Sequence, residues 1–431
     1  MRSDGERGAR LARGSRVVVV GYGRSGRAAL ALLVREGCTV RLLERNPKAM
    51  TEEEIQVLRA QGVAVYTGEH TKRHFAGADA VVISPGIPRA SLVPFVEEGC
   101  PILAEMELAW RYLNDEPILA VTGTSGKTTT VSLAAAMLQA QGLRVFLGGN
   151  IGTPLSEYVL DKRQADVLVL EVSSFQLQCC DTLAPRVAVL LNISPNHLDY
   201  HKDMKEYCDA KFRLFRWQDA NDLAVLGKGL EAVACAYNLK GRTVWVSESN
   251  RFPESRLIGR HNRFNAEAAW QACRFFGVSE SNARKAVARF APLPNRLECV
   301  REHRGVLYVN DSKCTTLAAL RVALEAFDRP VRLLCGGKFK GGDVSLLLPV
   351  IEKHVVQVAL FGASREVFEP VFSRVVPVSW YPTLAPAVEA LFAEAKPRDV
   401  ILLSPATSSF DLYANYVERG RDFRSLVEAL P

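Results

Sequence analysis

The sequence lacks the features of several specialised protein classes. It has no run of about 18 apolar residues, so no membrane-spanning helix is predicted. Its ten cysteines include no C-x-x-C pair, which argues against a zinc site and against a disulfide framework. It has no short-period repeat and no low-complexity tract. We therefore expect neither a membrane protein, a disulfide scaffold nor a solenoid.

Charge of one sign is also scarce. Lys and Arg number 54 and Asp and Glu 47, for a net charge of +7, of which the first sixteen residues supply +3. So small an excess of positive charge does not predict nucleic-acid binding, although it suits anionic phosphorylated substrates. The Arg-rich start is not followed by a small-residue cleavage site, so we expect no signal peptide and a cytoplasmic protein.

The 431 residues suffice for two to four domains. Short β-branched runs alternate with helical stretches, such as those expected near 25–36 and 127–142, and this alternation restarts twice along the chain. Such alternation is typical of parallel sheets wound with helices. The sequence therefore predicts an α/β protein with three domains, at residues 1–104, 105–292 and 293–431.

The strongest motif is a glycine loop between an apolar strand and a helix. Backbone N–H groups of such a loop bind phosphate oxygens, Lys127 adds a positive charge, and the Thr128 hydroxyl is a ligand for Mg²⁺. Because Val121 occupies the first glycine position of the longer P-loop pattern, the match is to a shorter variant that begins at Gly123. A glycine-rich turn without function is the alternative.

Three further residues carry possible chemistry. Glu171 ends an apolar strand, where its carboxylate could hold the Mg²⁺ of a bound nucleotide, or could simply face solvent. His197 follows another strand and is either a metal or phosphate ligand or a plain surface residue. Lys211 lies on an amphipathic stretch, a pattern that by itself indicates a solvated helix lysine.

Other strand ends also carry loops typical of ligand sites. Gly21–Gly26 reads G-x-G-x-x-G, and Glu44 ends the next strand, which alone suggests NAD but fits any nucleotide diphosphate, including a UDP-sugar. Three loops of the last domain, at 310–316, 336–340 and 403–411, each follow a strand. We expect them to line one crevice with a second ligand.

Seven segments in order resemble the signatures of the Mur ligase family of ATP-dependent amide-forming enzymes: GTSGKTT, EVSSFQL, NISPNHLDYH, GRHNRFNAEAA, LPNRLE, NDSKCTT and LLSPATSSFD. Residues 84–88, SPGIP, resemble its first-domain loop. The resemblance covers nearly the whole chain. It implies a Rossmann-like UDP-sugar-binding domain, a central P-loop ATPase domain and a Rossmann-like C-terminal domain that binds an amino acid. The implied reaction adds D-glutamate to UDP-N-acetylmuramoyl-L-alanine (UDP-MurNAc-L-Ala) through an acyl phosphate, in peptidoglycan precursor synthesis.

The resemblance also assigns residues to each site. The catalytic set is Lys127, Glu171, His197 and Lys211, and the ligands of two Mg²⁺ ions are Thr128, Glu171, His197 and Lys211, the last carbamylated by CO₂. The ATP set is Gly123, Thr124, Ser125, Gly126, Lys127, Thr128, Thr129, Asn262, Asn265, Arg296 and Asp311. The UDP-sugar set is Arg24, Ser25, Glu44, Arg45 and Asn150, and the D-glutamate set is Thr315, Lys340, Ser409, Phe410 and Tyr416.

Four residues depart from the family pattern, namely Ser125, Asn196, Asn295 and Thr316, and Lys338-Phe339 loosens the alignment at Lys340.

An NAD-dependent dehydrogenase and a non-enzymatic nucleotide-binding regulator are alternatives, but the first leaves the P-loop unused and the second needs no crevice in the last domain. Within the family, another amino-acid specificity is the nearer rival, although the DNPR run of diaminopimelate-adding members is absent. We expect a monomer.

Overall fold

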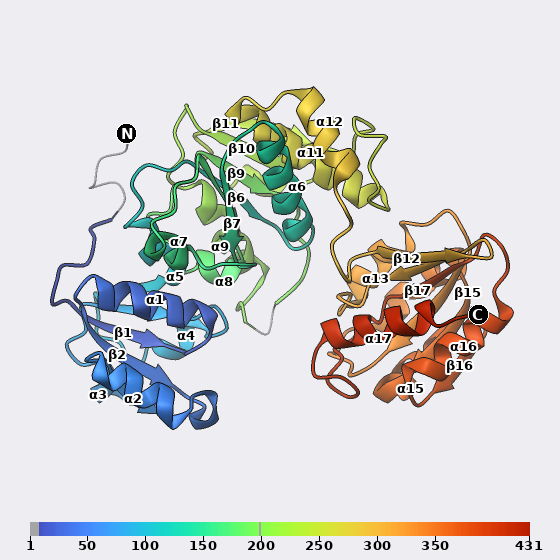
Figure 1. Ribbon diagram of the computed structural model, residues 1–431, viewed down its shortest axis with the longest axis horizontal. Coiled ribbons are helices and arrows are strands. Elements are labelled where there is room, and N and C mark those ends of the chain that lie inside the picture. Colours follow the sequence, from blue (N-terminus) through green and yellow to red (C-terminus); the bar gives the residue numbers. More distant parts are fainter. Residues whose placement is uncertain (1–7, 198–199) are drawn as a thin grey trace. The chain divides into compact units, whose positions relative to one another are not determined.

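The computed structural model describes residues 8–197 and 200–431, and the chain forms two compact units. The first comprises residues up to Phe252 together with Phe264–Val287, and the second comprises Pro253–Arg263 and the chain from Ala288 onward. Three sheets follow one another along the sequence, in blue, in teal to green and in orange to red (Figure 1). The α/β fold expected from the alternating pattern is confirmed.

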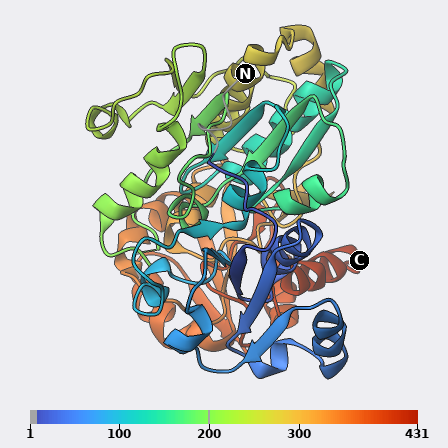
Figure 2. The same cartoon turned by 90° about the vertical axis from the view of Figure 1, so that its left-hand side faces the viewer.

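The first sheet has five parallel strands in the order β3-β2-β1-β4-β5. They are β1 (Arg16–Val20), β2 (Thr39–Glu44), β3 (Ala64–Thr67), β4 (Ala80–Ile83) and β5 (Ile102–Ala104). Its helices are α1 (Arg24–Arg35), α2 (Glu52–Ala60), α3 (Lys72–Phe75) and α4 (Arg89–Leu92). The valines of β1 are fully buried, because a parallel sheet is covered on both faces. β1 and β2 run side by side in Figure 2.

The second sheet has six parallel strands in the order β11-β10-β9-β6-β8-β7. They are β6 (Ile118–Thr122), β7 (Val145–Gly149), β8 (Val167–Glu171), β9 (Val187–Leu190), β10 (Leu223–Gly227) and β11 (Arg242–Val246). Its helices are α5 (Glu105–Trp110), α6 (Lys127–Ala140), α7 (Leu155–Leu160), α8 (Ser174–Leu177), α9 (Met204–Phe212), α10 (Glu231–Ala234), α11 (Arg260–Cys273) and α12 (Glu280–Arg289). β6 therefore lies inside the sheet, between β8 and β9, and its loop is central.

The third sheet has the order β12-β13-β17-β14-β15-β16, with only β12 antiparallel. Its strands are β12 (Glu298–His303), β13 (Val306–Asn310), β14 (Val331–Gly336), β15 (Val355–Phe361), β16 (Val378–Tyr381) and β17 (Val400–Leu403). Its helices are α13 (Leu317–Leu324), α14 (Leu348–His354), α15 (Arg365–Phe372), α16 (Leu384–Glu394) and α17 (Tyr416–Glu428). Because β13, β17 and β14 are adjacent and parallel, their following loops meet at one edge of the sheet.

Apolar clusters on the faces of these sheets form the core. One cluster joins the first two sheets, and two others fill the two faces of the third. Among the described residues, no helix is both long and apolar enough to cross a bilayer.

Candidate active site

The loop after β6 has the geometry of a phosphate-binding loop. Gly126 has φ +87° and caps α6, and a Cβ added there would lie 2.5 Å from Asn265 Oδ1. A side chain at this position would therefore meet both backbone strain and a collision with the α11 amide. The N-terminus of the fourteen-residue helix α6 follows directly, so its N–H groups and dipole favour an anion at the loop.

Residues after β9 hold this loop in place. The Ser125 N–H donates to Asn192 Oδ1 at 2.9 Å, and the Asn192 amide donates back to the Ser125 carbonyl at 3.2 Å. The Thr124 hydroxyl lies 3.0 Å from the hydroxyl of Tyr207 on α9 and accepts from the Ser194 N–H at 3.0 Å. The loop is thus fixed by its neighbours before any ligand binds, which reduces the cost of ordering it.

Two lysine ammonium groups converge on one carbonyl oxygen of the loop. Lys127 Nζ lies 2.8 Å from the Gly123 oxygen, and Lys211 Nζ lies 3.0 Å from the same atom. Lys127 also donates to the Thr124 carbonyl at 3.1 Å. The structure therefore brings together two cations that are 84 residues apart in the sequence, at the place where a phosphate would lie.

Lys211 is buried, with 1% of its surface exposed. Its ammonium lies 4.5 Å from the centre of the Tyr207 ring, and within the described ranges no carboxylate forms an ion pair with it. Burial first, and Lys127 second, lower the pKa of Lys211 to about 7. The interpretation of Lys211 as a solvated helix lysine is wrong, because α9 turns this side chain toward the loop and away from water.

Glu171 is also buried, at 2% exposure, so the interpretation as a solvent-facing strand end is wrong as well. It pairs in register with Val121, directly before the phosphate-binding loop. Its Oε1 accepts from the Asn150 amide at 2.8 Å, whereas Oε2 is buried and has no hydrogen-bond partner among the described residues. A buried carboxylate oxygen left unpaired is costly unless a cation satisfies it, so this residue fits a Mg²⁺ ligand.

His197 remains at the surface. It has φ +55°, its ring packs against Phe175 with centroids 4.8 Å apart, and its backbone N–H donates to Asn196 Oδ1 at 3.0 Å. Leu198 and Asp199 of the same motif lie outside the described residues. In the part of the chain that the structure describes, no three His, Cys, Asp or Glu side chains form a metal cluster. A metal here would rely on Thr128, Glu171, the surface residue His197 and a modified lysine.

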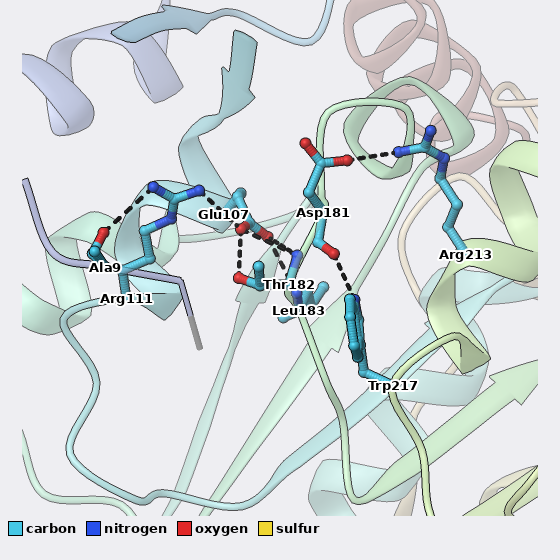
Figure 3. A network of polar contacts seen from close by, with 8 residues as sticks. All are labelled: Ala9, Glu107, Arg111, Asp181, Thr182, Leu183, Arg213 and Trp217. Atoms are coloured by element: carbon cyan, nitrogen blue, oxygen red, sulfur yellow. Dashed lines mark hydrogen bonds and ion pairs between the residues drawn. The ribbon is translucent and has the colours of Figure 1, made fainter. Parts of the chain in front are cut away.

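A polar network fixes the segment that leads from α8 toward β9 (Figure 3). The buried Glu107 carboxylate on α5 accepts from the Thr182 N–H, the Thr182 hydroxyl and the Leu183 N–H at 2.6 to 3.1 Å. The neighbouring Asp181 pairs with Arg213, two residues after Lys211, at 2.9 Å. Helix α5 and the end of α9 are therefore tied to the same loop.

The residues expected to bind the UDP-sugar differ in their burial and in their contacts. The Glu44 carboxylate accepts from the Tyr22 and Asn46 N–H groups at 2.7 and 2.9 Å, so it holds the first glycine loop in shape. Arg24 and Arg45 are exposed, Ser25 is half-buried, and Arg24 lies 3.6 Å from Glu157 on α7. Asn150 contacts Glu171, which places it beside the metal candidate in the central sheet.

In the second unit, the three loops expected to line one crevice do meet. The Ser404 hydroxyl donates to Asp311 Oδ2 at 3.0 Å, and the backbones of Lys338 and Ser408 exchange hydrogen bonds at 2.9 and 3.1 Å. Burial raises the pKa of Asp311 to about 7. The Ser312 hydroxyl donates to the Tyr416 carbonyl at 2.8 Å, which joins the loop after β13 to the start of α17.

The expected D-glutamate residues lie on these joined loops. Ser409 is buried, Lys340 and Phe410 are exposed, and Thr315 and Tyr416 are half-buried. The remaining nucleotide residues are divided between the units: Asn265 adjoins Gly126, whereas Asn262 donates to the Ile258 carbonyl and Arg296 faces Asp311.

The four departures from the family pattern all have local roles. Ser125 uses only its backbone, Asn196 accepts from the His197 N–H, and Thr316 caps α13 through the Ala319 N–H. Asn295 has φ +62° and accepts from the Asn310 amide at 3.0 Å. Asparagine tolerates this left-handed conformation better than most residues.

Two contributors were not singled out by sequence reasoning. Asn192 lies two residues after β9, inside the NISPNHLDYH motif, and Tyr207 lies four residues before Lys211, which places the two on one helix face. That spacing was an available signal for Tyr207. The hydrogen bond from Asn192 to the phosphate loop depends on the order of strands, which the sequence alone does not reveal.

A phosphate-binding loop on an inner parallel strand, a buried unpaired carboxylate on the next strand and convergent lysines define a nucleotide-dependent enzyme. Residues 15–103 match the MurD-like N-terminal domain of Mur ligases, residues 121–250 the Mur ligase middle domain, and residues 295–407 the glutamate ligase domain of Mur ligases. The chain belongs to the Mur ligase family.

Relatives named UDP-N-acetylmuramoylalanine--D-glutamate ligase are similar over nearly the full length. One from Desulfovibrio desulfuricans is 62% identical, covering 98% of both chains, and one from Lawsonia intracellularis is 50% identical, covering 96% of this chain and 94% of the other. The solved structure of MurF ligase from Thermotoga maritima in complex with ADP shares the fold, with a TM-score of 0.57 and 18% identity over 98% of this chain and 99% of the other.

Proposed function

We propose that this chain is an ATP-dependent ligase that joins D-glutamate to UDP-MurNAc-L-Ala in peptidoglycan precursor synthesis, with release of ADP and phosphate. The observation that carries the proposal is the 62% identity, over 98% of both chains, to a relative of that name. The site agrees with it, since a phosphate loop and convergent cations suit phosphoryl transfer to an anionic acceptor.

The chemistry needs an activated carboxylate, because a carboxylate oxygen is too poor a leaving group for direct attack by an amine. A carboxylate oxygen of UDP-MurNAc-L-Ala attacks the γ-phosphorus of ATP, and the bond from that phosphorus to ADP breaks. The amine of D-glutamate then attacks the carbonyl carbon of the acyl phosphate, loses a proton, and phosphate departs. Lys127, held by two carbonyl oxygens of its own loop, offsets the repulsion between the carboxylate and the triphosphate.

Mg²⁺ would neutralise phosphate charge when bound. We assign Thr128 and Glu171 to one ion, supported by the unpaired Glu171 Oε2. We assign His197 and carbamylated Lys211 to a second ion. Holding three substrates in fixed positions supplies further rate enhancement.

Carbamylation of Lys211 is supported by the electrostatics of the site. Two ammonium groups on one carbonyl oxygen repel each other, and burial removes the water that would screen them. With a pKa of about 7, much of the Lys211 amine is neutral and nucleophilic at neutral pH. Its nitrogen attacks the carbon of CO₂ and loses a proton, which replaces a repelled cation by an anion next to Lys127.

The remaining assignments are proposals of the same kind. UDP-sugar binding is assigned to Arg24, Ser25, Glu44, Arg45 and Asn150, and D-glutamate binding to Thr315, Lys340, Ser409, Phe410 and Tyr416. We also keep the domain boundaries near residues 104 and 292, a cytoplasmic location and a monomeric state as proposals.

The test is product formation by the purified chain. With ATP, Mg²⁺, UDP-MurNAc-L-Ala and a panel of D- and L-amino acids, phosphate release should require D-glutamate, and mass spectrometry should find the ligated product. Equal phosphate release with L-glutamate, or with no amino acid, would contradict the proposed specificity.

A further inference from the structure

His201 is a buried imidazole for which the proposed reaction has no use. It is 1% exposed and lies at the end of the segment that carries His197. Both ring nitrogens have side-chain partners: Nε2 lies 2.9 Å from the Ser174 hydroxyl, and Nδ1 lies 3.1 Å from the Gln178 amide nitrogen. Ser174 and Gln178 lie on or directly after α8, three and seven residues beyond Glu171.

These contacts determine the tautomer of the ring. The Gln178 amide nitrogen also donates to Glu206 Oε1 at 3.0 Å, which fixes the orientation of the amide. Since an amide nitrogen only donates, His201 Nδ1 must accept, and the proton is on Nε2, which donates to Ser174. Neither nitrogen is left for a metal or a substrate, so His201 is not a catalytic residue.

The ring and the backbone of His201 instead support three parts of the candidate site. The ring packs edge-on against Tyr207 with centroids 5.1 Å apart, and Tyr207 in turn contacts Thr124 of the phosphate loop and underlies Lys211. The backbone N–H of His201 donates to the backbone carbonyl of His197 at 2.9 Å. Through Ser174, the same residue holds the helix that follows Glu171.

We propose that His201 is a positioning residue that sets the relative placement of Glu171, Lys211 and the phosphate loop. This inference rests on the proposed function. Side chains that orient metal ligands from behind commonly change metal affinity or activity by about 10-fold to 100-fold when removed. His201 reaches each proposed ligand through one intermediate, Ser174 on the helix that follows Glu171 and Tyr207 beneath Lys211.

The test compares His201→Phe, which keeps a ring but loses both side-chain hydrogen bonds, with Ser174→Ala, which removes one partner. His354→Phe is the matched control, because the His354 ring hydrogen-bonds the Phe327 carbonyl and lies in the second unit. We expect His201→Phe to lower kcat by about 10-fold or more and leave the KM for D-glutamate within about twofold. Ser174→Ala should follow the same pattern to a smaller extent.

A second readout does not depend on turnover. Binding of Mn²⁺ in the presence of ADP, followed by electron paramagnetic resonance, should weaken by about 10-fold in His201→Phe and stay unchanged in His354→Phe. Unaltered Mn²⁺ binding together with an unaltered kcat in folded His201→Phe would overturn the inference. If that variant does not fold, wild-type kcat and wild-type Mn²⁺ binding in Ser174→Ala would overturn it instead. Failure of the wild-type enzyme to ligate D-glutamate would refute the proposed function. It would not refute the positioning role of His201, which Mn²⁺ binding tests separately.

Discussion

At the scale of single residues, the site is organised around the carbonyl oxygen of Gly123, to which both Lys127 and Lys211 donate. The two lysines are not equivalent. Lys127 starts helix α6 and is half-buried within the loop, whereas Lys211 comes from α9 and is almost fully buried. We therefore assign the permanent positive charge to Lys127 and the modified, anionic state to Lys211.

Lys127→Ala should abolish most turnover without unfolding the protein. Its ammonium donates to two loop carbonyls and the residue is only half-buried, and a lost contact to developing charge costs about 10²-fold or more in rate. Steady-state phosphate release and a thermal melt measure the two effects. Lys205→Ala, which removes an exposed lysine paired with Asp209, is the matched control and should behave as wild type. Near-normal turnover in folded Lys127→Ala would refute the assignment.

Lys211→Ala should also be inactive, but an added small carboxylate should restore part of its activity. The proposed carbamate is an anion, so acetate or formate should restore part of the activity, as small carboxylates that enter the space left by the side chain. Phosphate release with increasing acetate measures this, and Lys127→Ala should show no such recovery. Full activity of Lys211→Ala without any additive would contradict the carbamate.

At the scale of elements, α5 connects the first two sheets and carries two buried carboxylates. Glu107 binds the 181–183 loop, as Figure 3 shows, and Glu105 accepts from the Ser156 N–H on α7 at 2.5 Å. Glu105 Oε2 is buried without a hydrogen-bond partner, and burial raises the pKa of Glu105 to about 7. Helix α5 therefore contains a group whose protonation changes on unfolding.

Glu105→Gln should change how stability depends on pH. Between pH 4.5 and about 7 the folded protein keeps a proton that the unfolded chain releases, so the free energy of unfolding falls as pH rises through this window. Glutamine does not titrate. The free energy of unfolding of Glu105→Gln, relative to that of wild type, should therefore rise by up to about 1.4 kcal/mol per pH unit in this window and level off above pH 7. Denaturant unfolding at several pH values tests this, with exposed Glu98→Gln as control. Parallel pH profiles of wild type and Glu105→Gln would contradict it.

Elements with strong local patterns were the predictable ones. The helices expected near 25–36 and 127–142 are observed as α1 and α6, within two residues at each end. Strand β12 was missed, because its charged sequence lacks an apolar pattern and it forms by pairing antiparallel with β13 across Arg304 and Gly305, both at positive φ. The burial of Lys211 could not be predicted from the sequence pattern either, since it depends on how α9 packs against the phosphate loop.

At the scale of the whole molecule, three sheets divide the proposed substrates among separate parts of the chain. The first glycine loop, the phosphate loop and the loops of the third sheet each follow the ends of parallel strands, where ligands bind in open α/β sheets. Under the proposed assignments, amino-acid specificity is a property of the last domain. A dianionic amino acid needs at least two oriented contacts, and only one stereoisomer satisfies both while presenting its amine.

Lys340→Ala should raise the KM for D-glutamate and leave those for ATP and the UDP-sugar nearly unchanged. The exposed Lys340 lies two residues after Lys338, whose backbone pairs with Ser408 next to Ser409, so a carboxylate held by Ser409 lies near this lysine's loop. Substrate saturation curves for all three substrates provide the measurement, and exposed Lys353→Ala is the control. Unaltered D-glutamate saturation would show that Lys340 does not bind this substrate.

In the proposed reaction, ATP activates the carboxylate of UDP-MurNAc-L-Ala before D-glutamate attacks. Transfer of ¹⁸O from that carboxylate tests it most directly, because the oxygen that bonds to the γ-phosphorus leaves with the phosphate. With the carboxylate labelled and D-glutamate present, each phosphate released should carry one ¹⁸O atom, as measured by mass spectrometry. Unlabelled phosphate formed together with the ligated product would contradict the acyl phosphate and the mechanism built on this site.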